Sequence, residues 1–174
     1  MSYIMTDIEA DGPVPGLYNM VCFGAVVVRP GLKETFYAQT APLYPDKWDP
    51  EALAVSGFSH EQHLKFPHPE EAMRAFAAWL AKVSNGRPRF IADNNGFDWG
   101  YINWYFHKFL GKNPMGFSSA NLGSLYKGLV KSDRKNFKKL RKTKHDHHPV
   151  NDAKGNAEAL LHMRDNMGLD IRLD

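Results

Sequence analysis

Two carboxylates, Asp7 and Glu9, stand two residues apart at the end of the first predicted strand. Side chains alternate between the two faces of a β-strand, so this spacing places both acids on one face. Two acids that share a face repel each other unless a cation lies between them, and oxygen ligands of this kind suit Mg²⁺ or Mn²⁺. The same spacing is common on solvated strand ends, so the pair does not define a metal site by itself.

Two more acids lie where helices are predicted to begin. Asp98 follows a predicted buried strand and a turn that contains glycine, and Asp152 lies at the start of the last predicted helix. An acid in the first turn of a helix is ordinary, because it complements the helix dipole and the free backbone amides. Each of these acids therefore has a purely structural explanation when it is considered alone.

Three histidines, His145, His147 and His148, lie in the segment HDHHPVND, and His147 precedes Asp152 by five residues. An imidazole can accept a proton near neutral pH, which makes each histidine a candidate general base. Zinc binding is a second interpretation, but no cysteine lies nearby and the spacing provides no tetrahedral set of ligands. An exposed polar loop is the stronger of these two alternatives.

Hydrophobic patterns predict the elements that must position these residues. Three strands joined by turns rich in Gly and Pro form an antiparallel meander, and helices and strands then alternate to the end of the chain. This order predicts an α/β fold, in which helices flank a mixed central sheet that adds parallel strands to the meander. Asp49 is predicted to cap the first helix, and Asn151 or Asp152 to lie near the N-cap of the last. The predicted strands are 3–9, 20–28, 33–40, 87–93 and a segment near 115–119, and the predicted helices are 49–57, 69–83, 97–110, a segment near 122–130, and 151–168.

Length and composition predict a single globular domain over residues 1–174. The chain is 43% hydrophobic and is long enough to close a core without disulfides. Its one cysteine, Cys22, lies in the apolar run MVCFGAVVV and is predicted to be a buried strand residue. No basic amino-terminal region precedes an apolar stretch, and no segment approaches the roughly 20 apolar residues of a membrane span. These features predict a cytoplasmic protein with no membrane partner.

Positive charge is concentrated in one segment of the chain. Residues 127–144 contain nine Lys or Arg and one acid, although the net charge of the whole chain is only +3. This concentration favours contact with the phosphate backbone of a nucleic acid. A solvated, mobile loop rich in lysine is the alternative interpretation.

The motifs DIE, NNGFD and HHPVND, taken together and in this order, closely resemble the three exonuclease motifs of the DEDDh family. The resemblance covers roughly residues 3–165 and is much more specific than any one motif. It implies a ribonuclease-H-like fold and a 3′-to-5′ exonuclease that releases nucleoside monophosphates from single-stranded DNA or RNA 3′ ends. It also permits a homodimer, since relatives are often dimers.

Carried over position by position, the resemblance implies a catalytic set and a cofactor. Two Mg²⁺ (or Mn²⁺) ions would be held by four acids, with Asp7 bridging both ions, Glu9 and Asp152 on the side of the attacking water, and Asp98 at the second ion. His147 would be the general base. The implied substrate-binding residues are Ala10, Asp11, Gly12 and Asn94, and Phe58 is a further candidate for a substrate contact.

Some features depart from the family pattern. Asp93 stands where many members have a histidine, the basic segment before His147 is longer than in small relatives, and the turn DGPVPG is unusual. These departures bear on substrate preference more than on the chemistry. Two other functions remain open: a catalytically silent nucleic-acid-binding module, and a hydrolase of small phosphodiesters or of di- and trinucleotides.

Overall fold

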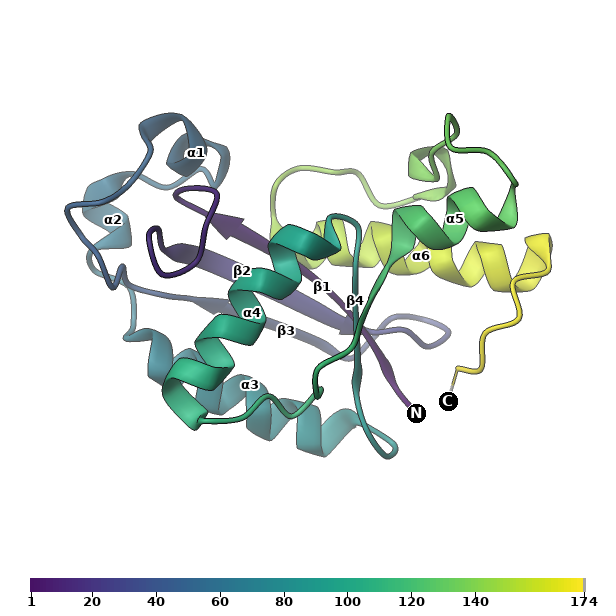
Figure 1. The fold of residues 1–174 in the computed structure, drawn as a ribbon, viewed down its shortest axis with the longest axis horizontal. Coiled ribbons are helices and arrows are strands. Elements are labelled where there is room, and N and C mark those ends of the chain that lie inside the picture. Colours follow the sequence, from purple (N-terminus) through teal and green to yellow (C-terminus); the bar gives the residue numbers. More distant parts are fainter. Residues whose placement is uncertain (174) are drawn as a thin grey trace.

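A computed structural model describes residues 1–173, and a five-stranded sheet forms its centre (Figure 1). The strands lie in the order β3-β2-β1-β4-β5, so the first strand of the chain is the middle strand of the sheet. Neighbouring strands are antiparallel from β3 to β1 and parallel from β1 to β5. The mixed sheet and its three-strand meander are therefore confirmed. The strands are β1 (Tyr3–Ala10), β2 (Met20–Val27), β3 (Thr35–Gln39), β4 (Arg89–Ala92) and β5 (Ser119–Asn121).

Helices cover both faces of this sheet, and two separate apolar cores fill the space beneath them. One core joins the sheet to α3 and α4, and the other joins it to α5 and α6; the two helix pairs lie apart in Figure 1. No helix in residues 1–173 combines the length and the apolar character needed to cross a membrane. The helices are α1 (Pro50–Val55), α2 (His60–His63), α3 (Pro69–Val83), α4 (Asn95–Leu110), α5 (Leu122–Leu129), the short 3₁₀ helix η1 (Lys138–Leu140) and α6 (Pro149–Met167).

Alternation along β1 decides which core each of its side chains faces. Ile4 and Ile8 belong to the core beneath α3 and α4, whereas Met5 belongs to the core beneath α5 and α6. With a period of two, Asp7 and Glu9 continue the series of Met5 and lie on the α6 side of the sheet. The strand thus presents its two acids to the helix that carries Asp152.

Several boundaries differ from the sequence prediction. The strand predicted near 115–119 lies later in the chain: β5 is Ser119–Asn121, and Gly116 has a φ of +83°, outside the extended range of a regular strand. The short strand β5 is defined by its pairing with β4. Its three residues show little hydrophobic pattern, so the sequence did not indicate its position. Helix α6 begins at Pro149 with His148 as N-cap, so the prediction of Asn151 or Asp152 near the cap is corrected by about one turn. Proline at the first helical position favours this earlier start.

Other predictions are confirmed. The Asp49 side chain caps α1 by accepting hydrogen bonds from the backbone amides of Glu51 and Ala52. Gly111 and Gly168 end α4 and α6 in the left-handed conformation that favours glycine. Cys22 is buried in β2. The sequence patterns did not predict α2 or η1, because each is a turn of four residues or fewer.

The first turn of α6 lies directly on β2, and Gly24 makes this close approach sterically possible. A Cβ atom at Gly24 would lie 2.5 Å from the backbone nitrogen of Val150 and 2.6 Å from the carbonyl carbon of Pro149. Gly24 also pairs with Asp7 in the sheet. Any larger residue here would push the start of α6 away from the acids of β1.

We expect Gly24→Ala to lower the free energy of unfolding by about 1–3 kcal/mol, because backbone atoms must shift to admit the methyl group. Thermal unfolding followed by circular dichroism measures this loss. Gly128→Ala is the matched control, since Gly128 lies in α5 with open space around it and should tolerate alanine. Equal melting temperatures for Gly24→Ala and the wild type would contradict the packing of α6 on β2.

Candidate active site

Three of the four predicted acids converge at the end of β1. Asp7 and Glu9 from β1 and Asp152 from the first turn of α6 each offer an oxygen, and these oxygens lie within 4.8 Å of one another. Asp7 and Glu9 are partly buried and Asp152 is fully buried. The structure thus brings acids that are far apart in sequence together at the carboxyl end of the central strand.

The fourth acid, Asp98, reaches β1 from the side on which β1 pairs with β4. Strand β4 pairs with β1 only as far as Met5, so the backbone amide of Ile8 has no partner strand on that side. Asp98 Oδ1 accepts a hydrogen bond from this amide at 3.1 Å. The early end of β4 thus leaves space for the first turn of α4 to bring its carboxylate beside β1.

The electrostatics of the site disfavour four bare negative charges. Burial, and then the charges of Asp98, Asp152 and Glu9, raise the pKa of Asp7 well above its usual range. Burial is also the main cause that raises the pKa of Glu9 to about 7 and that of Asp98 to about 8. These acids stay protonated over much of the neutral range unless positive charge offsets their repulsion.

This donor set fits a divalent metal ion. Asp152 Oδ2 is buried, and no donor in residues 1–173 meets it with hydrogen-bond geometry, although His145 Nδ1 lies 2.8 Å away. Asp152 Oδ1 accepts from the backbone amide of Asp146 at 3.2 Å. A buried carboxylate oxygen without a donor is costly, and a cation is the partner that such oxygens take in a cluster of acids. The unpaired oxygen and the raised pKa values of its neighbours therefore point to the same ligand.

The histidine loop lies across these acids. His147 has a φ of +62°, and its Nδ1 atom lies 3.5 Å from Glu9 Oε1. His145 Nδ1 lies 2.8 Å from Asp152 Oδ2. His148 is turned away, because its ring stacks on Tyr37 with centroids 5.0 Å apart. The structure thus brings two of the three histidines to the acids, including the one selected by its offset from Asp152.

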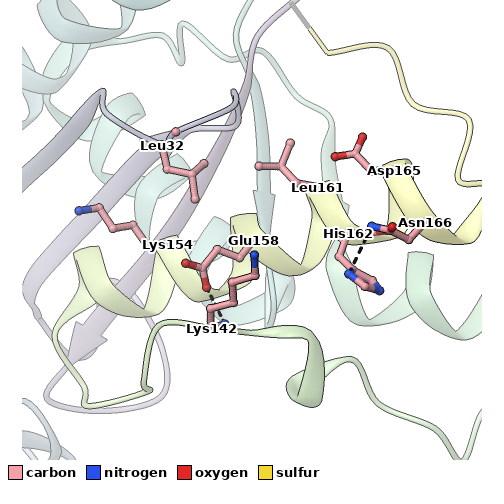
Figure 2. A pocket seen from close by; sticks show the side chains of 9 residues that line it. Leu32, Lys142, Lys154, Glu158, Leu161, His162, Asp165 and Asn166 are labelled. Atoms are coloured by element: carbon pink, nitrogen blue, oxygen red, sulfur yellow. Dashed lines mark hydrogen bonds between the residues drawn. The ribbon is translucent and has the colours of Figure 1, made fainter.

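The segment that leads into this loop is anchored at two points that sequence reasoning missed. Arg141 donates to Asp93 Oδ2 at 2.9 Å, and its guanidinium lies over the ring of Phe137. Glu158 of α6 accepts from the backbone amide of Lys142 at 2.7 Å (Figure 2), and from that of Thr143 at 2.7 Å. Asp93 was noticed as a departure from the family pattern, but its partner lies 48 residues away and no spacing in the sequence indicates the pair.

The cavity drawn in Figure 2 is distinct from the acid cluster. It has a volume of about 410 Å³ and is lined by residues of α6, the β2–β3 turn and Lys142, with none of the four predicted acids among them. Glu158 lines this cavity while its carboxylate holds the backbone of the loop segment. The clearest contribution of Glu158 is therefore to support the loop that carries His145 and His147.

The residues predicted to bind substrate have different surroundings. Asn94 is the N-cap of α4 and is exposed, with no hydrogen bond from its side chain to the helix. The Asp11 carboxylate is buried and accepts two hydrogen bonds from Asn19, so it is engaged within the fold. Gly12 is held by Tyr101, whose hydroxyl donates to its carbonyl oxygen. Ala10 is buried at the end of β1, and Phe58 packs edge to face on Phe66.

The raised pKa values predict how stability depends on pH and on metal. Between about pH 4 and pH 8 the folded protein binds more protons at Glu9 and Asp98 than the unfolded chain does, so its stability should fall as pH rises through this window. Mg²⁺ binds the ionised acids, and it should therefore raise the melting temperature more at pH 8 than at pH 5. Thermal melts with chelator and with Mg²⁺ at both pH values measure this difference. A Mg²⁺ effect that is equal at both pH values, or larger at pH 5, would count against the prediction.

Comparison with known proteins places the chain in a family. Residues 4–160 match the RNase_T exonuclease family. The 3′-5′ DNA exonuclease Cap18 of Escherichia coli is 32% identical, over 99% of this chain and 96% of the relative.

Solved structures share the fold at low sequence identity. The nuclease domain of 3′hExo, a DEDDh family member bound to rAMP, superposes with a TM-score of 0.76 at 15% identity, over 98% of this chain and 96% of that one. Exonuclease I of E. coli, in complex with a dT13 oligonucleotide, superposes with a TM-score of 0.69 at 13% identity, over 93% of this chain and 41% of that one. The family match and the relative agree, so the chain belongs to the RNase_T exonuclease family, and it shares its fold with the DEDDh family member 3′hExo.

Proposed function

We propose that residues 1–174 act as one domain that removes nucleoside monophosphates from the 3′ end of single-stranded nucleic acid, with two Mg²⁺ or Mn²⁺ ions as cofactors. The observation that carries this proposal is the convergence of Asp7, Glu9 and Asp152 within 4.8 Å, with Asp98 beside the same strand. Raised pKa values at Asp7, Glu9 and Asp98 support it, because they indicate a site that is completed by positive charge.

Asp7, Glu9 and Asp152 would hold one ion, and Asp7 and Asp98 the other. Bound there, the cations supply an acidified water and stabilise the negative charge that develops on the scissile phosphate. Asp98 keeps one oxygen on the Ile8 amide, which fixes its carboxylate while the other oxygen stays available. The rigid ends of β1 and the first turns of α4 and α6 would keep the four acids in place between turnovers.

His147 would accept the proton of the attacking water. Its Nδ1 faces Glu9, so an Nδ1–H group directed at that carboxylate leaves Nε2 free to take the proton. The water oxygen then bonds to phosphorus, the bond between phosphorus and the 3′ oxygen of the preceding nucleotide breaks, and that oxygen takes up a proton. The products are a nucleoside 5′-monophosphate and a strand shorter by one nucleotide.

Single-stranded DNA is the substrate that we propose first. The E. coli relative at 32% identity is named a DNA exonuclease, and it aligns with nearly all of this chain. The basic segment ends at the histidine loop, and most of its Lys side chains are exposed, so it is suited to follow the phosphate backbone of a bound strand. RNA remains the second substrate to compare.

The experiment that tests the proposal uses single strands of DNA and RNA labelled at either end. Release of mononucleotides from a 3′ label, and a ladder that shortens from a 5′ label, are expected with Mg²⁺ or Mn²⁺ and should stop with chelator. Dinucleotides in a parallel reaction separate a polymer exonuclease from a hydrolase of short products. Binding of strands without degradation under every metal would overturn the proposal and favour a silent binding module.

A further inference from the structure

A second group of metal-ligating side chains lies on the outer side of the acid cluster. His145, His147 and Asp152 each offer one ligand atom, and these atoms lie within 4.8 Å of one another. Both imidazoles are about half exposed, at 47% and 49%, whereas the Asp152 side chain is 1% exposed. A buried carboxylate thus lies beneath two accessible rings that can turn toward it.

The contact between His145 and Asp152 is close but does not satisfy the carboxylate. His145 Nδ1 lies 2.8 Å from Asp152 Oδ2, yet this oxygen has no donor with hydrogen-bond geometry in the described part of the chain. A hydrogen bond requires the N–H bond of His145 to point at the carboxylate oxygen. A metal ion does not, because it binds the lone pairs of the nitrogen and of the oxygen directly. This oxygen belongs both to the acid cluster and to the histidine group, so a cation on either side of it would satisfy it.

The loop backbone holds the two rings close to each other and to Asp152. The Asp146 carboxylate accepts from the His148 amide at 3.1 Å and from the Asn151 side chain at 2.9 Å, which ties the loop to the start of α6. His147 has a left-handed backbone, and its ring meets that of His145 edge to face with centroids 4.6 Å apart. Both histidines are thereby directed to the same side of the helix terminus.

The chemistry of these ligands selects a class of metal. Two imidazoles and one carboxylate with an open fourth position suit Zn²⁺ and similar first-row ions, whereas Mg²⁺ prefers oxygen ligands. Bonds of about 2.0 Å in a tetrahedral site require ligand atoms to lie nearer together than 4.8 Å, and rotation of the exposed rings supplies this movement. Spacing in the sequence did not indicate such a set, because Asp152 completes it from the adjoining helix.

We propose that His145, His147 and Asp152 form a binding site for Zn²⁺ or a similar transition metal, and that occupation of this site stops the exonuclease. The inhibitory part rests on the proposed function, in which His147 accepts a proton and Asp152 holds a catalytic ion. Zn²⁺ at this site ties up the lone pair of His147 and one oxygen of Asp152. The protein then remains folded but inactive until Zn²⁺ is removed.

Direct binding tests the site without any nuclease assay. Zn²⁺ is titrated calorimetrically into the metal-free full chain, and the titration is repeated with millimolar Mg²⁺, which competes for Asp152. His145→Ala should bind Zn²⁺ at least about 10-fold more weakly. Loss of a residue that only hydrogen-bonds to a metal ligand typically costs that much, and His145 would be a ligand itself. His162→Ala is the matched control, since His162 lies near the far end of α6 and is not part of the trio. No binding by wild type, or equal affinity for wild type and His145→Ala, would overturn the site.

Inhibition is tested separately on a labelled DNA strand with Mg²⁺ and increasing Zn²⁺. The concentration of Zn²⁺ that halves the rate should rise about 10-fold or more in His145→Ala and stay unchanged in His162→Ala. Unchanged sensitivity of a His145→Ala protein that has lost Zn²⁺ binding would overturn the inhibitory role. Absence of all degradation with Mg²⁺ alone would instead count against the proposed function, and the calorimetric result would still decide the site.

Discussion

Asp7→Asn is expected to abolish 3′-to-5′ degradation and, at the same time, to raise the melting temperature of the metal-free protein. The pKa of Asp7 is raised by burial and by three neighbouring acids, so replacing its carboxylate with a neutral amide relieves repulsion within the cluster. The same change removes the acid that we expect to contact both ions. Lost metal stabilisation of the transition state is worth several kcal/mol, which corresponds to about 10³-fold or more in rate.

The two effects are measured on one protein preparation. Thermal melts at pH 8 with chelator should show a rise of about 2–4 °C for each kcal/mol of repulsion removed, and Mg²⁺ should no longer increase stability. Asp165→Asn is the control, since this exposed acid at the end of α6 pairs with Arg164 and lies outside the cluster. An inactive Asp7→Asn protein that is also less stable than wild type would indicate a structural role for Asp7 and would weaken the metal interpretation.

The pairing of Asp7 with Glu9 could be predicted from the sequence because it depends on local periodicity. A spacing of two residues places Asp7 and Glu9 on one strand face, and the structure confirms that they lie together with Asp152. The contribution of Asp98 required more than periodicity, since it depends on how early β4 stops pairing with β1. The resemblance to a family predicted that arrangement, whereas the residues around Asp98 taken alone favoured an ordinary helix start.

The supports of the histidine loop could not be predicted, because each depends on a contact that the completed fold creates. Asp93 pairs with Arg141, which lies 48 residues away in the sequence. Glu158 binds the backbone amides of Lys142 and Thr143, and a contact to backbone cannot be predicted from the pattern of side chains. The basic segment illustrates the same limit. Its charge was evident, but Phe137 is buried and η1 orders the residues that follow it, so the segment is anchored to the fold at several points.

His147→Ala is expected to lower the rate of the chemical step by about 10²–10⁴-fold, because general-base catalysis typically contributes that much. Mg²⁺ should still raise its melting temperature, since all four acids remain. His147 has a φ of +62°, which alanine adopts less readily than asparagine does. His147→Asn therefore separates loss of the base from backbone strain, and it should be as inactive as His147→Ala.

His145→Ala decides between the two histidines that face the acids. The contact of His145 with Asp152 is shorter than that of His147 with Glu9, at 2.8 Å against 3.5 Å, so distance alone favours His145. The motif favours His147, which has the five-residue offset from Asp152, and Glu9 can orient its Nδ1–H so that Nε2 stays available for a proton. Single-turnover rates should therefore fall far more in His147→Ala than in His145→Ala. The reverse order would assign proton transfer to His145 and would make His147 a residue that positions Glu9.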